Sequence, residues 1–331
     1  MPDLAEIIGS VFPKKTVVIV GDLVADQFLS GTISRVSREA PVFIMRHEET
    51  MTLPGAAANA AANVASLGGR AVLVGAVGND ANGGKLRDAL KDAGVATDSL
   101  VEDASISTTT KVRVLAGQQF AAKNQVVRID YESAETLDVD DLRENLASAA
   151  ANADAIIVSD YNYGGVTAEL FADALVIARE RNTPVVVDSR FRLGEFASAT
   201  SATPNREEVE HILGPQFTDE DCESLRQQLG IEALLVTNGS DGMTLYETDR
   251  SPVRISAVGP RTAVDVTGAG DTVIAAYALG LACGMSFADA ARIANHAGGI
   301  AVMKKRTATV SSDELLESLK NYPDSALSNQ A

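Results

Sequence analysis

Short runs of β-branched and aliphatic residues recur along this chain, and their alternation with helical segments constrains the fold more than any other feature. The runs are 16–20, 71–75, 155–159, 184–187 and 233–237. Each is almost entirely apolar, which is typical of strands buried on both faces of a sheet. Segments with helical spacing lie at 83–94, 138–152, 167–181, 218–229 and 287–303. The alternation predicts an α/β fold, a doubly wound and mostly parallel sheet with helices on both faces.

Two segments interrupt the alternation, at about 30–53 and 106–131. Residues 41–45 look like a short strand with no helix after it, whereas charged and apolar residues alternate in 107–115 and 125–130, as in an antiparallel ribbon. We expect these segments to form a small β lid inserted into a single domain over residues 1–331. The ribbon carries Lys111, Arg113 and Arg128, which could offer cations to an anionic substrate. For any one of them, a solvated charge on an edge strand is the alternative.

Composition restricts the partners. The formal net charge is -17 and no block of basic residues is present, which argues against nucleic acid and anionic membranes as partners. The two cysteines, Cys222 and Cys283, cannot form a disulfide framework and point to a reducing compartment. No signal pattern begins the sequence, and the longest apolar run is too short to span a bilayer. We therefore expect a cytoplasmic protein that acts on small molecules.

The motif D-V-T-G-A-G-D at 265–271 is followed directly by a helical segment at 272–279. Its bare main chain would place the N–H groups of Gly268, Ala269 and Gly270 at a helix N-terminus, where free donors favour an anion. Asp271 beside this cradle is suited to accept a proton from an attacking hydroxyl. The motif thus predicts phosphoryl transfer to an alcohol. A tight strand-to-helix turn is the competing interpretation of the glycines.

Polar residues follow several predicted strands. Asp22 and Asp26 come after the first run and are candidates for binding substrate hydroxyls, although turn or cap aspartates have the same pattern. In the small-residue segment 54–68, Asn59 and Asn63 share one helix face.

Asn205 and Glu208 lie three residues apart at a helix start. The pair could hold a hydrated Mg²⁺, and a helix-capping pair is the alternative.

These motifs resemble the PfkB (ribokinase-like) family of sugar kinases. Residues 265–271 resemble its C-terminal signature and 55–68 its N-terminal Gly/Asn segment, within a similarity that runs from about Lys15 to Leu319. More closely, 34–42, 109–114 and 124–130 look like the kinase part of bacterial D-glycero-β-D-manno-heptose-7-phosphate kinases. In that group a nucleotidyltransferase often follows the kinase, and we expect none within this sequence.

The resemblance implies a ribokinase-like fold and an ATP- and Mg²⁺-dependent kinase, acting on the anomeric hydroxyl of a heptose 7-phosphate. It gives Asp271 the role of base and residues 268–270 that of anion hole. It assigns Asp26, Gly55, Asn59 and Asp160 to the sugar, Asn205, Thr237, Gly239, Gly242, Asp265 and Asn295 to ATP, and Glu208 to magnesium through water. It further implies a homodimer formed through the lid and allows a monovalent cation, although Arg306 stands where the family commonly has glycine.

Two other functions remain open from the sequence. One is a PfkB kinase for another acceptor, such as fructose, ribose or a fructose phosphate. The other, from a different class, is a non-catalytic protein that binds sugar or nucleotide.

Overall fold

A ten-stranded sheet forms the centre of the molecule, in the order β14-β13-β12-β11-β10-β9-β8-β1-β4-β5. The computed structural model describes residues 4–118, 121–133, 137, 139–322 and 327–328. The strands are β1 Thr16–Gly21, β4 Arg70–Gly78, β5 Leu100–Asp103, β8 Ala155–Asp160, β9 Val185–Ser189, β10 Ser201–Ala202, β11 Ala233–Thr237, β12 Met243–Glu247, β13 Val253–Ile255 and β14 Leu327–Ser328. Neighbours from β11 to β5 pair in parallel, and β12 to β14 continue the sheet antiparallel. The predicted sheet is confirmed.

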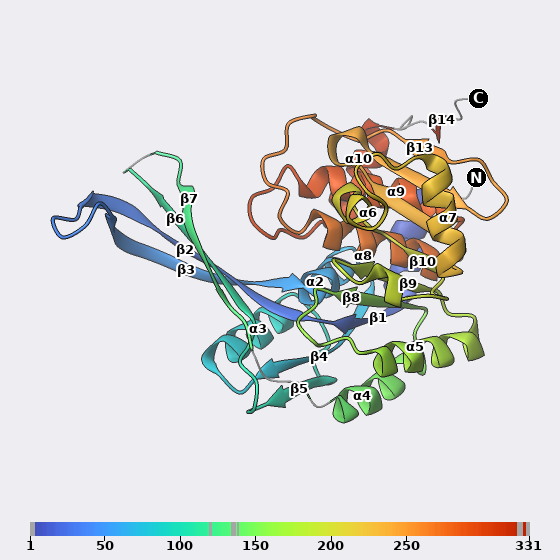
Figure 1. The fold of residues 1–331 in the computed structure, drawn as a ribbon, viewed down its shortest axis with the longest axis horizontal. Coiled ribbons are helices and arrows are strands. Elements are labelled where there is room, and N and C mark those ends of the chain that lie inside the picture. The colour runs from blue at the N-terminus through green and yellow to red at the C-terminus, as the bar shows by residue number, and fades with distance from the viewer. Residues whose placement is uncertain (1–3, 119–120, 134–136, 138, 323–326, 329–331) are drawn as a thin grey trace.

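Helices cover both faces of this sheet (Figure 1). One face carries α2 Ala57–Ser66, α3 Ala81–Asp92, α8 Ala269–Ala282, α9 Phe287–Ala301 and α10 Ser312–Asn321, and the other α4 Asp140–Ala150, α5 Ala168–Arg181, α6 Arg206–Leu213 and α7 Asp219–Leu229. A short helix, α1 Leu4–Glu6, begins the described chain. Strand β1 shows why both faces must be covered. Val17 and Ile19 pack into one core and Val18 and Val20 into the other, all at most 1% exposed.

A second sheet, in the order β3-β2-β6-β7, projects from the body (Figure 1). Its strands are β2 Leu23–Val36, β3 Phe43–Ala56, β6 Thr110–Gly117 and β7 Asn124–Tyr131. The antiparallel ribbon expected from the charge alternation is β6 with β7. We call this four-stranded sheet the lid.

The expected short strand at 41–45 was wrong in extent. Strand β3 runs for 14 residues and pairs with β2 from Phe43 opposite Val36 to Ala56 opposite Leu23. The sequence did not indicate the full length of β3, because residues 46–50 are polar and lack a strand-like alternation. Both faces of the β2–β3 hairpin are largely exposed near its tip, so no such alternation is required there. The helix expected from 138 begins at Asp140, and Asp138 lies outside the described residues, as do residues 119–120 of the lid segment.

None of the helices in the described part of the chain combines the length and hydrophobicity needed to cross a membrane.

Candidate active site

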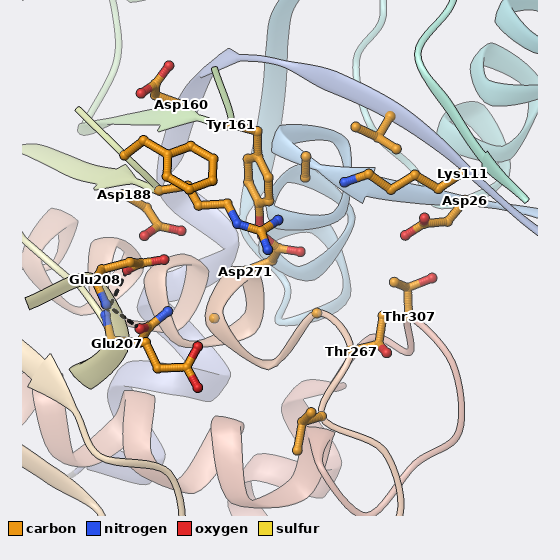
Figure 2. A pocket seen from close by; sticks show the side chains of 18 of the residues that line it. Asp26, Lys111, Asp160, Tyr161, Asp188, Glu207, Glu208, Thr267, Asp271 and Thr307 are labelled. Atoms are coloured by element: carbon orange, nitrogen blue, oxygen red, sulfur yellow. Dashed lines mark hydrogen bonds between the residues drawn. The ribbon is translucent and has the colours of Figure 1, made fainter. Parts of the chain in front are cut away.

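A cavity of about 700 Å³ opens where the carboxyl ends of the central strands meet the lid and the start of α8. Its walls include Asp26, Lys111, Asp188, Glu208 and Asp271 (Figure 2). Gly268 lines it as well. A smaller cavity of about 170 Å³ is lined by Thr237, Gly239, Gly242, Ala269 and Asn295. The two cavities share Thr237, Val266 and Gly270. Asp26 and the three lid cations, predicted for the acceptor, thus line the large cavity, and four residues predicted for ATP line the small one, with Gly270 of the glycine motif shared by both.

Asp271 lies in the first turn of α8, at the floor of the large cavity. The helix can begin there because Gly268 adopts a φ of 77° as the N-cap residue, a conformation that favours glycine. The Asp271 side chain is 3% exposed and accepts hydrogen bonds from Asn59 Nδ2 at 2.7 Å and the Tyr161 hydroxyl at 2.8 Å. Burial raises the pKa of Asp271 to about 6, and these two hydrogen bonds counteract part of that rise. Such a carboxylate is ionised at neutral pH and basic enough to accept a proton.

The predicted N–H cradle is smaller in the structure than in the sequence analysis. The Ala269 N–H donates to the Val266 carbonyl at 3.2 Å, so the protein itself occupies that donor. For Gly268 and Gly270 the described residues provide no acceptor, and both line the large cavity. Two of the three predicted donors are thus available to an anion at the start of α8.

Asn59 and Gly55 support other residues and do not line the large cavity. Asn59 is 1% exposed and directs its amide nitrogen at Asp271. A Cβ at Gly55 would lie 2.6 Å from Asp26 Oδ2, so the absence of a side chain makes room for that carboxylate. Their expected contacts with sugar stay predictions, and the observed geometry gives both a supporting position.

Three of the predicted aspartates have carboxylates that the protein already occupies. Asp22 accepts from the N–H groups of Tyr161, Tyr163 and Gly165 at 2.7 to 3.1 Å and faces a separate small cavity. Asp160, fully buried, accepts from Ser189 Oγ at 2.6 Å and pairs with Arg192. Asp265 accepts from the N–H groups of Thr267 at 3.0 Å and Arg306 at 2.9 Å. These bonds fix the loops around the cavity.

The three cations predicted on the lid all line the large cavity, but their pairing differs. Arg113 forms an ion pair with Asp26, and Arg128 with Asp130. Lys111 is 7% exposed and its Nζ lies 5.6 Å and 5.2 Å from the ring centres of Tyr161 and Tyr163. Burial lowers the pKa of Lys111. Among the described residues this ammonium has no carboxylate partner, so it can receive an anionic ligand.

Acidic side chains form the opposite wall of the large cavity (Figure 2). Burial raises the pKa of Glu208 to about 7, and burial together with the charge of Glu208 raises the pKa of Asp188 well above its usual range. The buried Thr203 hydroxyl also lines this cavity and has no hydrogen-bond partner among the described residues. Two crowded carboxylates and a free hydroxyl fit a hydrated Mg²⁺, which takes few protein ligands. No group of three or more acidic, His or Cys side chains in the described chain is arranged to hold a metal.

Asn205 and Glu208 also form the capping box considered as their alternative role. The Glu208 N–H donates to Asn205 Oδ1 at 2.9 Å, and the Asn205 N–H to Glu208 Oε2 at 2.8 Å. Both residues still line the large cavity, so the cap orients them toward it.

Tyr161, Arg190 and Thr307 line the large cavity and were not predicted as site residues. Tyr161 and Arg190 directly follow the strand ends 155–160 and 185–189, a position that does signal the ligand edge of a parallel sheet. Thr307 carries no such signal, because only the packing of its loop against Gly268 brings it to the cavity.

The chain is similar to known proteins over most of its length. Residues 14–314 match the family described as pfkB family carbohydrate kinase. The "Bifunctional protein HldE" of Gluconobacter oxydans is 39% identical over 320 residues, covering 93% of this chain and 65% of that protein. Its namesake in Geobacter sulfurreducens is 39% identical over 311 residues, covering 91% and 62%. The chain thus spans just under two thirds of the length of these curated relatives.

Two solved structures share the fold. Ribokinase from Arabidopsis thaliana, complexed with ribose and ATP, has a TM-score of 0.71 at 24% identity, over 92% of this chain and 98% of that one. Phosphofructokinase-2 from Escherichia coli, in complex with substrates and products, has a TM-score of 0.72 at 18% identity, over 93% and 99%. The chain therefore belongs to the pfkB family of carbohydrate kinases, and the enzyme class predicted from its sequence, a sugar kinase that uses ATP, is confirmed.

Proposed function

We propose that this kinase phosphorylates the anomeric hydroxyl of D-glycero-D-manno-heptose 7-phosphate, with Asp271 as the base. The observation that carries the proposal is the position of Asp271. Its ionised carboxylate lies on the floor of the large cavity, beside the free N–H groups of Gly268 and Gly270. The sugar follows from the resemblance of the lid segments to heptose 7-phosphate kinases and from the similarity to the HldE proteins.

The reaction requires one proton transfer and one phosphoryl transfer. Asp271 accepts the proton of the acceptor hydroxyl as that oxygen forms a bond to the γ-phosphorus. The bond from phosphorus to the β–γ bridging oxygen breaks, and ADP leaves with that oxygen. The N–H groups of Gly268 and Gly270 donate to the phosphoryl oxygens, where negative charge accumulates in the transition state. When bound, magnesium supplies further positive charge beside Asp188, Glu208 and Asn205.

ATP is proposed to place its base in the small cavity. Its lining includes the four residues predicted for ATP, Thr237, Gly239, Gly242 and Asn295, and the apolar side chains of Val258 and Val302. The shared residue Gly270 would then lie beneath the phosphates, which lead into the large cavity. We regard residues 1–331 as one kinase domain, with the lid strands as its insertions.

The phosphate carried by the acceptor is proposed to bind at the lid. Lys111 is available without breaking an ion pair, whereas Arg113 and Arg128 would exchange Asp26 and Asp130 for phosphate oxygens. A second candidate acceptor, an uncharged sugar such as fructose or ribose, is favoured by the same two ion pairs. With such an acceptor, both pairs could stay as they are in the structure.

ADP release measured with a panel of acceptors tests the proposal. Heptose 7-phosphate should give a higher kcat/KM than fructose, ribose or fructose phosphates. Asp271→Asn should lower kcat by at least about 10³-fold while ATP still binds. A higher kcat/KM with another acceptor would overturn the substrate, and near-normal turnover by Asp271→Asn would overturn the base.

We also propose that two copies of the chain pair through the lid. Phe43, Val126, Val127, Ile129 and Tyr131 are 43% to 60% exposed on this projecting sheet, and a second lid would cover them. Sedimentation should show a dimer for the wild type and a monomer for the double variant Phe43→Glu, Ile129→Glu. A wild-type monomer at micromolar concentration would contradict the proposal.

A further inference from the structure

We propose that Arg190 is a further catalytic residue, whose guanidinium contacts the phosphoryl group as it moves from ATP to the acceptor. This inference rests on the proposed position of the phosphates beside Gly270. It does not depend on which sugar is the acceptor.

Arg190 follows strand β9 directly, at the edge of the sheet where the large cavity opens. Its main-chain N–H donates to the Asp160 carbonyl at 3.0 Å, which fixes the backbone. The exposed side chain lines the cavity, with its guanidinium 5.6 Å from the centre of the Phe191 ring. In the described part of the protein, no carboxylate or other acceptor holds this guanidinium. The main chain of Arg190 is therefore held in place, whereas its guanidinium is free to bind a ligand.

The charge of Arg190 acts on both walls of the cavity. On the acidic wall, it counteracts part of the rise that burial causes in the pKa of Asp188 and of Glu208. It also lowers the pKa of Lys111, which extends from the lid. Arg190 lines the same cavity as Asp188, Glu208 and Lys111, so its guanidinium can reach the space between the two walls, where the γ-phosphate would pass from ATP to the acceptor.

The acidic lining of the large cavity explains why a cation is needed at the position of Arg190. Asp188, Glu207, Glu208 and Asp271 line it and repel a triphosphate. Two other guanidiniums of the described residues line the large cavity, and both are paired: Arg113 with Asp26 and Arg128 with Asp130. Arg190 is the guanidinium on the body of the protein that lines this cavity without a carboxylate partner in the described chain.

A guanidinium is well suited to this task. Its planar fork can donate two hydrogen bonds to two oxygens of one phosphoryl group, which a lysine ammonium does with less geometric specificity. The N–H groups of Gly268 and Gly270 lie at the start of α8, whereas Arg190 approaches from the end of β9. Together they would surround the phosphoryl oxygens in the transition state.

Steady-state kinetics of Arg190→Ala and Arg190→Lys test this role, using the sugar that the wild type phosphorylates fastest. Arg190→Ala should lower kcat by about 10²- to 10³-fold, with KM for ATP changed by less than about threefold. Added guanidinium ion should restore part of the kcat of Arg190→Ala and leave the wild type unaffected. Arg190→Lys should have an intermediate kcat. Arg206→Ala is the matched control, since Arg206 pairs with Glu210 outside the large cavity, and its kcat should stay at the wild-type value.

Three results would overturn the inference. An unchanged kcat would make Arg190 a bystander, and a raised KM for ATP with unchanged kcat would restrict it to ground-state binding. If added guanidinium ion does not restore the kcat of Arg190→Ala, and Arg190→Lys has an equally low kcat, Arg190 has a structural role. Thermal unfolding of the variants would show such a role independently. A wild type that prefers another sugar would refute the heptose substrate alone, because these comparisons use the preferred acceptor.

Discussion

Asn59 Nδ2 donates a 2.7 Å hydrogen bond to Asp271 Oδ2, and two further hydrogen bonds determine the orientation of the Asn59 amide. Asn59 Oδ1 accepts from Asn63 Nδ2 at 3.2 Å, and Asn63 Oδ1 accepts from the main-chain N–H of Val310 at 3.2 Å. A main-chain N–H can only donate, so each amide in the chain has one permitted orientation. Asn59 must therefore present its N–H to the base.

Replacing Asn59 by alanine should lower the ionised fraction of Asp271 at pH 7 without unfolding the protein. Loss of the donor removes a contact that favours the ionised carboxylate, so the pKa of Asp271 should rise above about 6. We expect kcat/KM at pH 7 to fall by at least about 10-fold, and the acid limb of its pH profile to move to higher pH. Asn145→Ala, which removes an amide bonded to the Ser99 carbonyl, is the control. An unshifted limb would show that Asn59 does not tune the base.

The pH dependence of the wild type should reveal two carboxyl groups. The base works when ionised, so activity is present above the pKa of Asp271, about 6, and is lost as the pH falls through it. Glu208 has a pKa of about 7, and its protonation should also lower activity as the pH falls. The measurement is kcat/KM between pH 5 and 9 in the wild type and in Glu208→Gln. The variant should retain one limb near pH 6, and a profile without that limb would exclude Asp271 as the titrating base.

Stability should depend on a buried histidine in α9. His296 is 0% exposed, and its Nδ1 lies 2.8 Å from Ser318 Oγ. Burial lowers the pKa of His296 to about 4 from a model-peptide value of 6.5, so the folded protein holds the ring neutral. The stabilisation from this residue is complete above pH 6.5 and is lost as the pH falls toward 4, by roughly 3 kcal/mol. Urea unfolding at both pH values should show a smaller loss in His296→Gln than in the wild type. Equal losses would contradict this account.

Two glycines of the proposed ATP site should respond differently to alanine. Gly242 has a φ of 92°, and a Cβ there would overlap with the Ile255 carbonyl of the neighbouring strand. Gly239 has a φ of 57°, and a Cβ there would meet nothing within 4 Å. Gly239→Ala should cost about 1 kcal/mol of unfolding free energy, and Gly242→Ala more than about 2 kcal/mol because backbone must also move. Thermal unfolding and KM for ATP measure both, and an equal effect of the two changes would contradict the predicted order.

Thr307 provides a test of the acceptor side. Its hydroxyl is buried at the cavity and has no hydrogen-bond partner among the described residues. Valine has nearly the same shape, so Thr307→Val should leave the unfolding free energy unchanged or raise it by up to about 1 kcal/mol. If the hydroxyl contacts the acceptor, KM for the sugar should rise while KM for ATP stays constant. Thr183→Val, which removes a hydroxyl bonded to the Ala153 carbonyl, should lower stability instead. An unchanged KM for the sugar would remove Thr307 from the site.

The sequence by itself determined the central sheet and the place of the base in the chain. Runs such as 16–20 can only be stable as strands covered on both faces, and the glycine motif sets Asp271 in the first turn of a helix through residues that are its immediate neighbours. Both are local consequences of side-chain shape and backbone freedom.

Only the tertiary structure decided which polar groups are free to act. Asp22, Asp160 and Asp265 look like ligand-binding residues in the sequence, but the fold supplies donors that occupy their oxygens. Asn59 reaches Asp271 across 212 residues, a contact set by the packing of α2 against α8. The chemistry of a carboxylate depends on its burial and hydrogen bonds, and those come from segments that the sequence does not place side by side.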